Sequence, residues 1–525
     1  MTCRWTQCRL VPSLARLVLP ALLGAPASVL GQPAPRAAER AEAVERVRAY
    51  RDRHQRETFE ELLALLAIPN VASDRDNIRK NARRLVRMLR QRGAEARLLE
   101  AEDSPAAVYG HLQVPGARRT VVFYAHYDGQ PADPERWDSP PWNPVLRDSA
   151  GQELPRSALH GDVDGEWRIQ ARSASDDKSP IVAMLTAIDA LRDAGIPPSV
   201  NLKFFFEGEE EAGSPHLEAI LRRHAALLDA DLWLFCDGPV HPSGRQQVVF
   251  GVRGVVDLEM TVYGALRSLH SGHYGNWAPN PIALLTDCLA SMRDGDGQVH
   301  IDGFYDDLRP RTRAEERALA EIPAVEEQLR HELALARTEA GGARLMERIL
   351  LPAMNLRGIR SGQVELEAKN AVPTEAKASI DFRLVPDQTP AKLRERVEAH
   401  IRKQGFHIVE DVPDLQTRRQ HAKIVRLRWG AGYPALRTSM ELPVSRAVLQ
   451  AADEAVGGRV IRIPSLGGSL PLYLFREILD TPLIVVPMVN HDNNQHAPNE
   501  NLRIQNFWNG IEMYANLMAR LGELW

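Results

Sequence analysis

Acidic and imidazole side chains of this chain lie where apolar segments stop, at the start of a helical pattern, or after a later apolar segment. Such a cluster of acids would repel itself and raise its own pKa values. Divalent cations remove that conflict, because carboxylate and imidazole are ligands for zinc, manganese or cobalt. The pattern therefore predicts a metal site. The candidate residues are His126, Asp128, Asp176, the run 207–211, Asp237 and His496.

The apolar segments that precede several of these residues predict the strands that position them. Residues 119–126, 200–206 and 231–236 are continuous apolar runs rich in β-branched and aromatic residues, which favours buried strands. Helical patterns at 177–192 and up to 227 separate them, which indicates a mostly parallel α/β sheet. In such sheets ligand sites collect at the carboxyl ends of the strands. We therefore expect the candidate residues to share one rim.

The pattern changes near residue 246 and returns after residue 440. Alternating strand patterns occur at 255–262 and 375–384, with helical patterns at 311–348 and 391–403. A helix at 444–455, a strand at 482–486 and a helix at 502–521 then resume the α/β style. This order predicts a discontinuous α/β catalytic domain with an inserted α+β domain. The expected bounds are 1–31 for a leader, 36–248 for the first catalytic part, 249–440 for the insertion and 441–525 for the second catalytic part.

Each candidate segment also has a purely structural explanation. An Asp-Asp pair before a helix caps it, an acidic run is usually a solvated face, and Asp237-Gly-Pro is a common turn. A single histidine such as His496 is more often a surface or core residue than a ligand. The joint occurrence of all segments, each at a strand exit or helix start, favours the site.

Composition excludes several classes of protein. The chain has 525 residues, with 65 Lys and Arg against 69 Asp and Glu, and no long basic run, which argues against a nucleic-acid partner. The 35 Gly, 36 Pro and 4 Cys exclude collagen-like, disordered and disulfide-scaffold proteins. After the N-terminus, no apolar stretch approaches the roughly 18 residues of a membrane span. A multi-domain globular protein remains.

The N-terminus has the pattern of a secretory signal. Arginines precede the apolar run 17–23, and small residues offer cleavage sites after Ala27 or Gly31. The alternatives are a frayed N-terminus or an apolar anchor. We expect export to the periplasm or medium, with Cys236 and Cys288 left in the mature chain, too few for a disulfide framework.

Six segments carry a family resemblance that extends from about Glu60 to the C-terminus. They resemble the M20 metallopeptidases, and most of all the branch of carnosinase-like and cytosolic dipeptidases. The segments are His126-Tyr-Asp-Gly-Gln-Pro, Ala174-Ser-Asp-Asp-Lys, Phe206-Glu-Gly-Glu-Glu-Glu-Ala-Gly-Ser, Cys236-Asp-Gly, Leu269-His-Ser-Gly and Asp381-Phe-Arg-Leu-Val-Pro.

The resemblance implies two divalent metal ions, with zinc expected and manganese or cobalt as alternatives. Asp176 would bridge them, His126 and Asp237 would complete one site, and Glu211 and His496 would complete the other. Asp128 would orient the first histidine. Glu210 matches the family's general base, which takes a proton from a metal-acidified water. Adjacent glutamates can divide the two roles because consecutive residues point in different directions.

The resemblance also implies that the inserted domain is a lid through which two subunits form a homodimer. His270 would reach the partner's site and stabilise an oxyanion, and Arg383 would bind a substrate carboxylate. Ala171, Ser173 and Ser179 stand where the family usually has glycine, so the backbone there is expected to differ. The remaining implied substrate contacts are Asn370, Gly467, Gly468 and Ser469.

Three functions follow from these residues. The first is a di-metal peptidase for dipeptides or short peptides with a free C-terminal carboxylate. The second is an N-acyl-amino-acid deacylase using the same site. The third is a periplasmic binding protein with a structural metal, which the base Glu210 contradicts. His-Glu-x-x-His, Gly-x-Ser-x-Gly and P-loop signatures are missing, and residues 430–435 match only part of a dinucleotide fingerprint.

Overall fold

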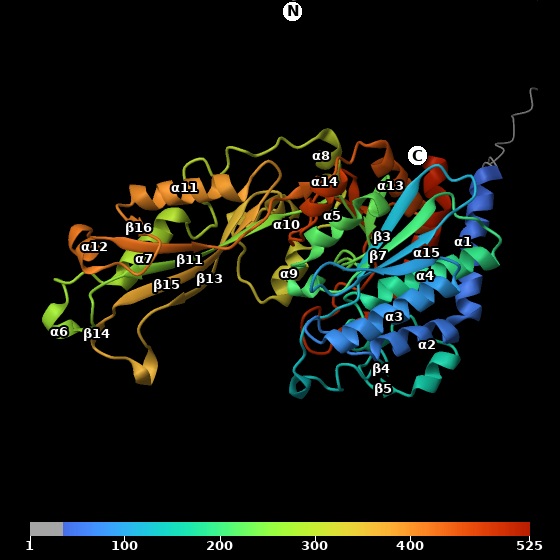
Figure 1. Ribbon diagram of the computed structural model, residues 1–525, viewed down its shortest axis with the longest axis horizontal. Coiled ribbons are helices and arrows are strands. Elements are labelled where there is room, and N and C mark those ends of the chain that lie inside the picture. The colour runs from blue at the N-terminus through green and yellow to red at the C-terminus, as the bar shows by residue number, and fades with distance from the viewer. Residues whose placement is uncertain (1–34) are drawn as a thin grey trace, which may run out of the picture. The chain divides into compact units, whose positions relative to one another are not determined.

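The computed structural model describes residues 35–525, and residues 43–525 form one compact unit (Figure 1). The predicted leader, residues 1–31, lies outside the described residues. None of the described helices is long and apolar enough to cross a membrane. Cys236 and Cys288 are buried and unpaired.

An eight-stranded sheet forms the centre of the catalytic body. Its middle strands are parallel, as expected, since β3 pairs in parallel with both β7 and β8, and β8 with β20. The antiparallel β1 and β2 extend one edge. In order across the sheet the strands are β1 (Glu95–Leu99), β2 (Ala107–Leu112), β7 (Asn201–Glu207), β3 (Thr120–His126), β8 (Leu232–Phe235), β20 (Leu483–Val485), β9 (Gln247–Val249) and β19 (Ile461–Ile463).

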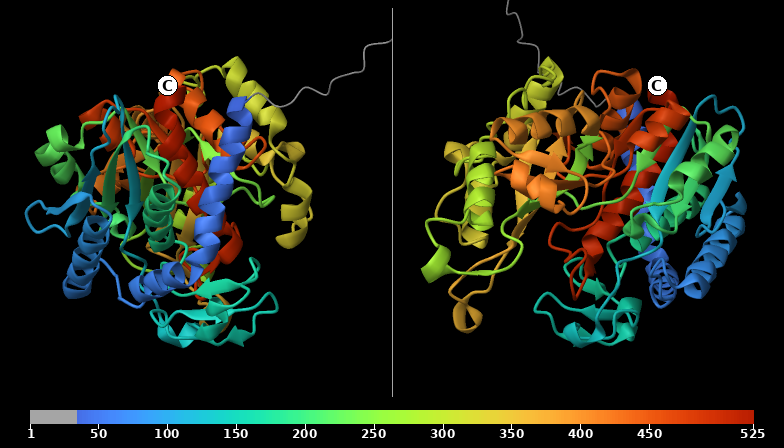
Figure 2. Two further views of the ribbon diagram at one scale, coloured as in Figure 1. Left: turned by 90° about the vertical axis from the view of Figure 1, so that its right-hand side faces the viewer. Right: turned by 60° about the vertical axis from the view of Figure 1, so that its left-hand side comes forward.

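Helices cover both faces of this sheet (Figures 1 and 2). Along β3, Val121 and Phe123 belong to one core cluster, while Val122 and Tyr124 belong to the other. This alternation explains why the strands are apolar throughout. The first face packs against α2 (Gln55–Leu66), α3 (Arg75–Gln91), α4 (Lys178–Asp193), α13 (Pro443–Ala455) and α15 (Ile504–Leu524), and the second against α5 (Leu217–Leu228) and α14 (Tyr473–Leu479). The chain enters this body through α1 (Pro35–Arg53).

A small antiparallel sheet is linked by an ion pair to the segment that carries His496. No strands are predicted from the sequence at 146–170, whereas the structure has paired strands there. Arg168 forms an ion pair with Asp492 at 2.5 Å, which ties the sheet to the loop before His496. The strands, in order, are β21 (Asn501–Arg503), β6 (Arg168–Gln170), β4 (Val145–Arg147) and β5 (Glu153–Leu154).

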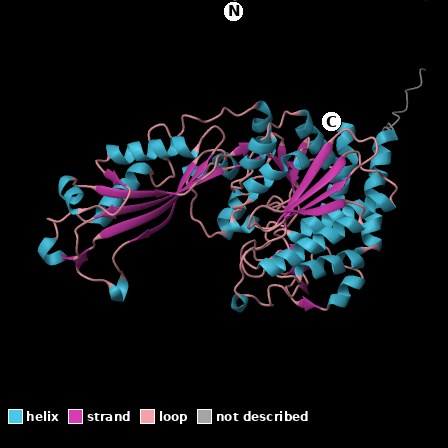
Figure 3. Cartoon of the chain, in the orientation of Figure 1, coloured by secondary structure: helices cyan, strands magenta, loops and turns pink. Residues whose placement is uncertain are grey.

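The part of the inserted domain that is built on a second sheet, of five strands, is called the lid from here on and has its own core (Figure 3). Helices α7 (Pro281–Met292) and α11 (Pro390–Lys403) contribute to this core. The strand order is β13 (Ala353–Arg360), β15 (Glu375–Leu384), β11 (Gly254–Tyr263), β17 (Ile424–Trp429) and β16 (His407–Val409). Shorter elements of the lid are β12 (Leu269–His270), α6 (Ser271–Tyr274), β14 (Ala371–Val372) and α12 (Leu415–Gln420).

Part of the predicted insertion, residues 249–440, packs on the catalytic body. Leu319, Ile322 and Leu350 belong to the core cluster that contains β3 and α5 residues. The chain therefore leaves the lid, crosses the body through α8 (Arg313–Glu321), α9 (Glu326–Glu332) and α10 (Leu345–Ile349), and returns to the lid at β13. The chain passes between body and lid twice more, at β10 (Gly251–Val252) and at β18 (Leu436–Arg437), and these two short strands pair with each other.

Candidate metal centre and active site

Asp176 lies between two histidines that come from distant parts of the chain. Its Oδ1 is 2.7 Å from Nε2 of His126, and its Oδ2 is 3.0 Å from Nε2 of His496. His496 Nε2 is also 3.2 Å from Glu211 Oε2. One carboxylate that offers each oxygen to a different histidine has the geometry of a bridging ligand.

The ionisable groups at this centre shift one another's pKa values. Burial opposes ionisation of Asp176, but hydrogen bonds from His126 and His496 hold the pKa of its carboxyl well below the usual range. Hydrogen bonds to Asp176 and Glu211 raise the pKa of His496 to about 10. Burial would lower the pKa of His126, yet its hydrogen bonds to Asp128 and Asp176 raise it well above normal. These carboxylates therefore favour positive charge at both histidine positions.

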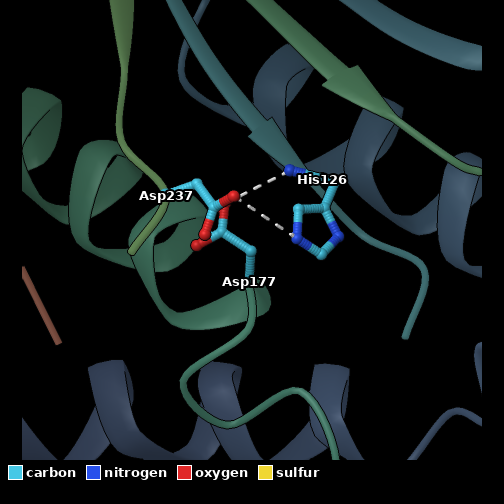
Figure 4. A group of neighbouring side chains, drawn as sticks. All are labelled: His126, Asp177 and Asp237. Atoms are coloured by element: carbon cyan, nitrogen blue, oxygen red, sulfur yellow. Dashed lines mark hydrogen bonds and ion pairs between the residues drawn. The ribbon is translucent and has the colours of Figure 1, made fainter. Parts of the chain in front are cut away.

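A second group of potential ligands contains His126, Asp177 and Asp237, with one ligand atom of each within 4.8 Å of the others (Figure 4). Burial, followed by repulsion from Asp176, raises the pKa of Asp237 to about 7. Asp177 Oδ2 accepts a hydrogen bond from the backbone N–H of His126 at 3.2 Å, but its buried Oδ1 has no hydrogen-bond partner among the described residues. An unsatisfied buried carboxylate oxygen beside imidazole and carboxylate donors fits a divalent cation. The sequence gives Asp177 only a capping role.

Asp128 joins the exits of two strands. Its side chain accepts hydrogen bonds from the backbone N–H groups of Glu210 (3.1 Å) and Glu211 (3.0 Å). Nδ1 of His126 lies 3.2 Å from the Asp128 carbonyl oxygen and 3.4 Å from its Oδ1. Asp128 thus fixes the ring of one candidate ligand and the backbone of another.

Glu210 and Glu211 begin the 3₁₀ turn η3 (Glu210–Ala212), which follows β7, and their side chains have different neighbours. Glu211 belongs to the group with Asp176 and His496, and Gln130 donates a hydrogen bond to its Oε2 at 2.8 Å. Glu210 belongs to neither ligand group, yet its Oε2 is 4.0 Å from His126 Nε2. Burial raises the pKa of Glu210 well above its usual value. A carboxylate in this position can exchange protons beside the metal centre.

Glu500 holds the loop that presents Asp176, a role that the sequence does not indicate. Its carboxylate is fully buried and accepts backbone N–H bonds from Ser173, Ser175 and Asp176, each at 2.9 Å. Arg172 adds a buried ion pair at 2.8 Å. Of the three positions where the family usually has glycine, only Ser173 takes a left-handed φ, of 62°. The Glu500 bonds compensate for that strained backbone.

The predicted carboxylate-binding residues meet at the junction of lid and body. Arg383 Nη1 donates to Ser469 Oγ at 2.9 Å, and Arg253 Nε donates to the Gly467 carbonyl oxygen at 2.9 Å. Ser469 lines a cavity of about 300 Å³ together with the candidate metal ligands. Its other lining residues include Asp176, Glu210, Glu211, Asp237, Tyr433, Leu470 and His496.

His270 and Asn370 lie close to each other in the lid, away from the cavity. The backbone N–H of Ser271 donates to the Asn370 carbonyl oxygen at 3.0 Å, and His270 pairs with Ala371 where β12 meets β14. Both side chains are exposed, and neither residue lines the cavity of its own chain. A single chain therefore brings together every predicted metal residue but not these two lid residues.

Comparison with known proteins identifies the family. Residues 122–520 match the model of peptidase family M20/M25/M40. The Cys-Gly metallodipeptidase dug1 of Schizosaccharomyces pombe is 26% identical over 434 residues, which cover 80% of this chain and 83% of that protein. The human Beta-Ala-His dipeptidase is 26% identical over 432 residues, covering 80% and 78%.

Solved structures of this family have a similar fold. An M20 family metallo-carboxypeptidase, Sso-CP2 from Sulfolobus solfataricus, has a TM-score of 0.72 at 27% identity and covers 89% of this chain and 99% of its own. Human carnosine dipeptidase 1 has a TM-score of 0.71 at 22% identity, with 91% and 99% covered. The predicted family, branch and α/β fold are thereby confirmed. The chain belongs to peptidase family M20/M25/M40 and is a hydrolytic enzyme.

Proposed function

We propose that this enzyme is a di-metal dipeptidase that cleaves the amide bond of dipeptides or short peptides bearing a free C-terminal carboxylate. The observation that carries the proposal is the position of Asp176 between His126 and His496, with Glu210 beside them. The relatives named above are dipeptidases, which supports this substrate class.

In this proposal Asp176 would be shared by two divalent ions, for which zinc is the expected metal and manganese or cobalt are alternatives. His126 and Asp237 would hold one ion, and Glu211 and His496 would hold the other. When bound, the ions would acidify a water molecule and polarise the substrate carbonyl. Asp177 lies in the group with His126 and Asp237 and is an additional candidate ligand.

Glu210 is the proposed general base. It faces the centre without joining either ligand group, so its carboxylate is free to accept the proton of the attacking water. The same carboxylic acid would then protonate the departing amine. Asp128 maintains this geometry by holding the backbone of both glutamates.

Arg383 and the loop of Gly467, Gly468 and Ser469 are proposed to bind the C-terminal carboxylate of the substrate. A guanidinium and a hydroxyl suit this anion, and Ser469 lies on the wall of the cavity. At about 300 Å³ the cavity is at the lower end of the range for ligand pockets.

We further propose that two lids form a homodimer in which His270 and Asn370 complete the partner's site. Large apolar side chains are exposed on the lid, among them Leu266, Trp277 and Leu415. Arg418 of α12 donates to the Gly264 carbonyl oxygen, and Gly264 lies against Pro281, so the segments that carry these side chains are neighbours. An apolar surface of this kind is typical of an interface.

Residues 1–31 are proposed to be a signal peptide, which would place the mature enzyme in the periplasm or medium. Expression of the full chain followed by N-terminal sequencing of the exported protein tests this proposal. A mature protein that starts near residue 28 or 32 supports it, and retention of Met1 in the cytoplasm contradicts it.

The decisive experiment for activity is a substrate screen with metal-reconstituted enzyme. Dipeptides such as Ala-Leu are compared with N-acyl amino acids such as N-acetyl-leucine. We expect hydrolysis of the dipeptides. Hydrolysis of N-acyl amino acids alone would instead assign the deacylase function to the same residues.

A further inference from the structure

The cavity of the active site has one wall that differs from the rest. The candidate metal residues give one side of the lining acidic and imidazole groups, whereas Tyr433, Leu470 and Pro471 present an aromatic and apolar surface. The ring of Tyr433 stacks on that of Tyr473, with centroids 5.7 Å apart and planes inclined by 12°. We call these four residues, Tyr433, Leu470, Pro471 and Tyr473, the aromatic wall.

The backbone fixes the position of Tyr433. Its N–H donates to the Val255 carbonyl oxygen at 2.8 Å, and the Val255 N–H donates back at 3.1 Å. Gly432 has a φ of 65°, and a Cβ there would lie 2.7 Å from Cβ of Val256. Residues 432 and 433 are therefore clamped against β11, at the junction of lid and body. Burial raises the pKa of Tyr433 to about 12, so its hydroxyl stays neutral at ordinary pH.

The aromatic wall adjoins the proposed carboxylate site. Leu470 and Pro471 directly follow Ser469, whose Oγ accepts a hydrogen bond from Arg383. A side chain and a carboxylate branch from the same Cα of a substrate's last residue. When Arg383 and Ser469 hold that carboxylate, the neighbouring surface available to the side chain is the aromatic wall.

We propose that the aromatic wall recognises the side chain of the substrate's C-terminal residue and selects apolar or aromatic residues over glycine. This inference rests on the proposed function, because it assumes that Arg383 and Ser469 bind the carboxylate. Burial of a large apolar side chain against Tyr433 removes its surface from water, whereas glycine leaves the wall solvated. Tyr433 is thus a specificity-determining residue, and its ring rather than its hydroxyl makes the distinction.

The test compares Ala-Phe, Ala-Leu and Ala-Gly as substrates of the metal-loaded enzyme. We expect kcat/KM for Ala-Phe to exceed that for Ala-Gly by about 10- to 100-fold, the discrimination that an apolar pocket provides. In Tyr433→Ala this ratio should fall to near one. Tyr433→Phe is the matched control, because it keeps the ring and removes the hydroxyl, and it should keep the ratio.

Each contrary outcome has a separate meaning. Equal kcat/KM for Ala-Phe and Ala-Gly in the wild-type enzyme would overturn the inference without any variant. A loss of kcat on both peptides in Tyr433→Phe would assign the hydroxyl to the chemistry and also overturn it. If no dipeptide is hydrolysed, the proposed function fails. The wall is then tested by calorimetric binding of N-acetyl-phenylalanine and N-acetyl-glycine to the metal-loaded protein, where equal affinity contradicts it.

Discussion

The rim of the catalytic body and the outer end of the lid contain residues with very different surroundings. On the rim, Asp176 contacts His126 and His496 within one chain, and its side chain is buried. On the lid, His270 and Asn370 are exposed and do not line the cavity of their own chain. One chain thus brings together the candidate metal residues, whereas His270 and Asn370 lie away from the cavity of the same chain.

The difference has a physical cause. Charged groups on the rim are held by buried hydrogen bonds, such as those that Glu500 accepts from the loop of Asp176. These bonds hold the loop of Asp176 in one conformation. At the lid's outer end Trp277 is 80% exposed and Leu366 is fully exposed, which is costly for large apolar side chains without a covering surface.

Removal of metal should have the largest effect. We expect a chelator to abolish dipeptide hydrolysis, because the rim residues position the reaction only around bound cations, and we expect added zinc or manganese to restore it. Atomic absorption should find about two ions per chain in the active protein. Hydrolysis that survives complete removal of metal would contradict the proposed mechanism.

Substitution of His270 tests whether the lid acts across subunits. His270→Ala should reduce kcat by about 10²–10³-fold, as loss of an oxyanion donor does. When His270→Ala chains are mixed and reassembled with Glu210→Gln chains, the mixed dimers should each contain one intact site. Statistical mixing then predicts recovery of about one quarter of wild-type activity.

The complementation result separates the two arrangements of the lid. Recovery of activity on mixing requires that His270 serve the partner's site. No recovery, together with a dimer seen by analytical ultracentrifugation, would place His270 in its own chain's site and remove the contrast between rim and lid. A control mixture of Glu210→Gln with itself should stay inactive.

Arg383 lies at the junction between the two regions and should have a smaller effect. Arg383→Lys keeps the charge but loses the planar fork, so KM should rise by about tenfold while kcat changes little. Steady-state kinetics on Ala-Leu give both values. A large fall in kcat with unchanged KM would mean that Arg383 does not bind the ground-state carboxylate.

Much of the fold could be predicted from the sequence, because strand and helix patterns are local. The prediction of a strand at 375–384 matches β15, and the strand exits carrying His126 and Asp237 lie on one rim. The helical pattern at 311–348 did not show that α8 packs on the catalytic body, since amphipathicity does not identify the surface that covers a helix. The small sheet containing β6 was also missed, because two- and three-residue strands have no periodicity.

The candidate site was predictable where residues end strands and not where they act through the backbone. His126 and Asp237 stand out by type and by their position at strand exits, and the structure brings them together. Glu500 acts by accepting N–H groups of the loop 173–176, a role that depends on tertiary structure alone. Asp177 and Tyr433 are similar, because tertiary structure alone places Asp177 beside His126 and Asp237 and places Tyr433 in the lining of the cavity.

The most direct test of the account is metal binding and turnover in Glu210→Gln. The proposal separates the ligands from the base, so this variant should bind about two ions per chain, as the wild type does, while kcat falls by about 10²–10⁴-fold. Glutamine keeps the size of the side chain and accepts no proton at neutral pH. Wild-type turnover in the fully metal-loaded variant would contradict the assignment of Glu210, and loss of one ion would show that Glu210 is a ligand instead.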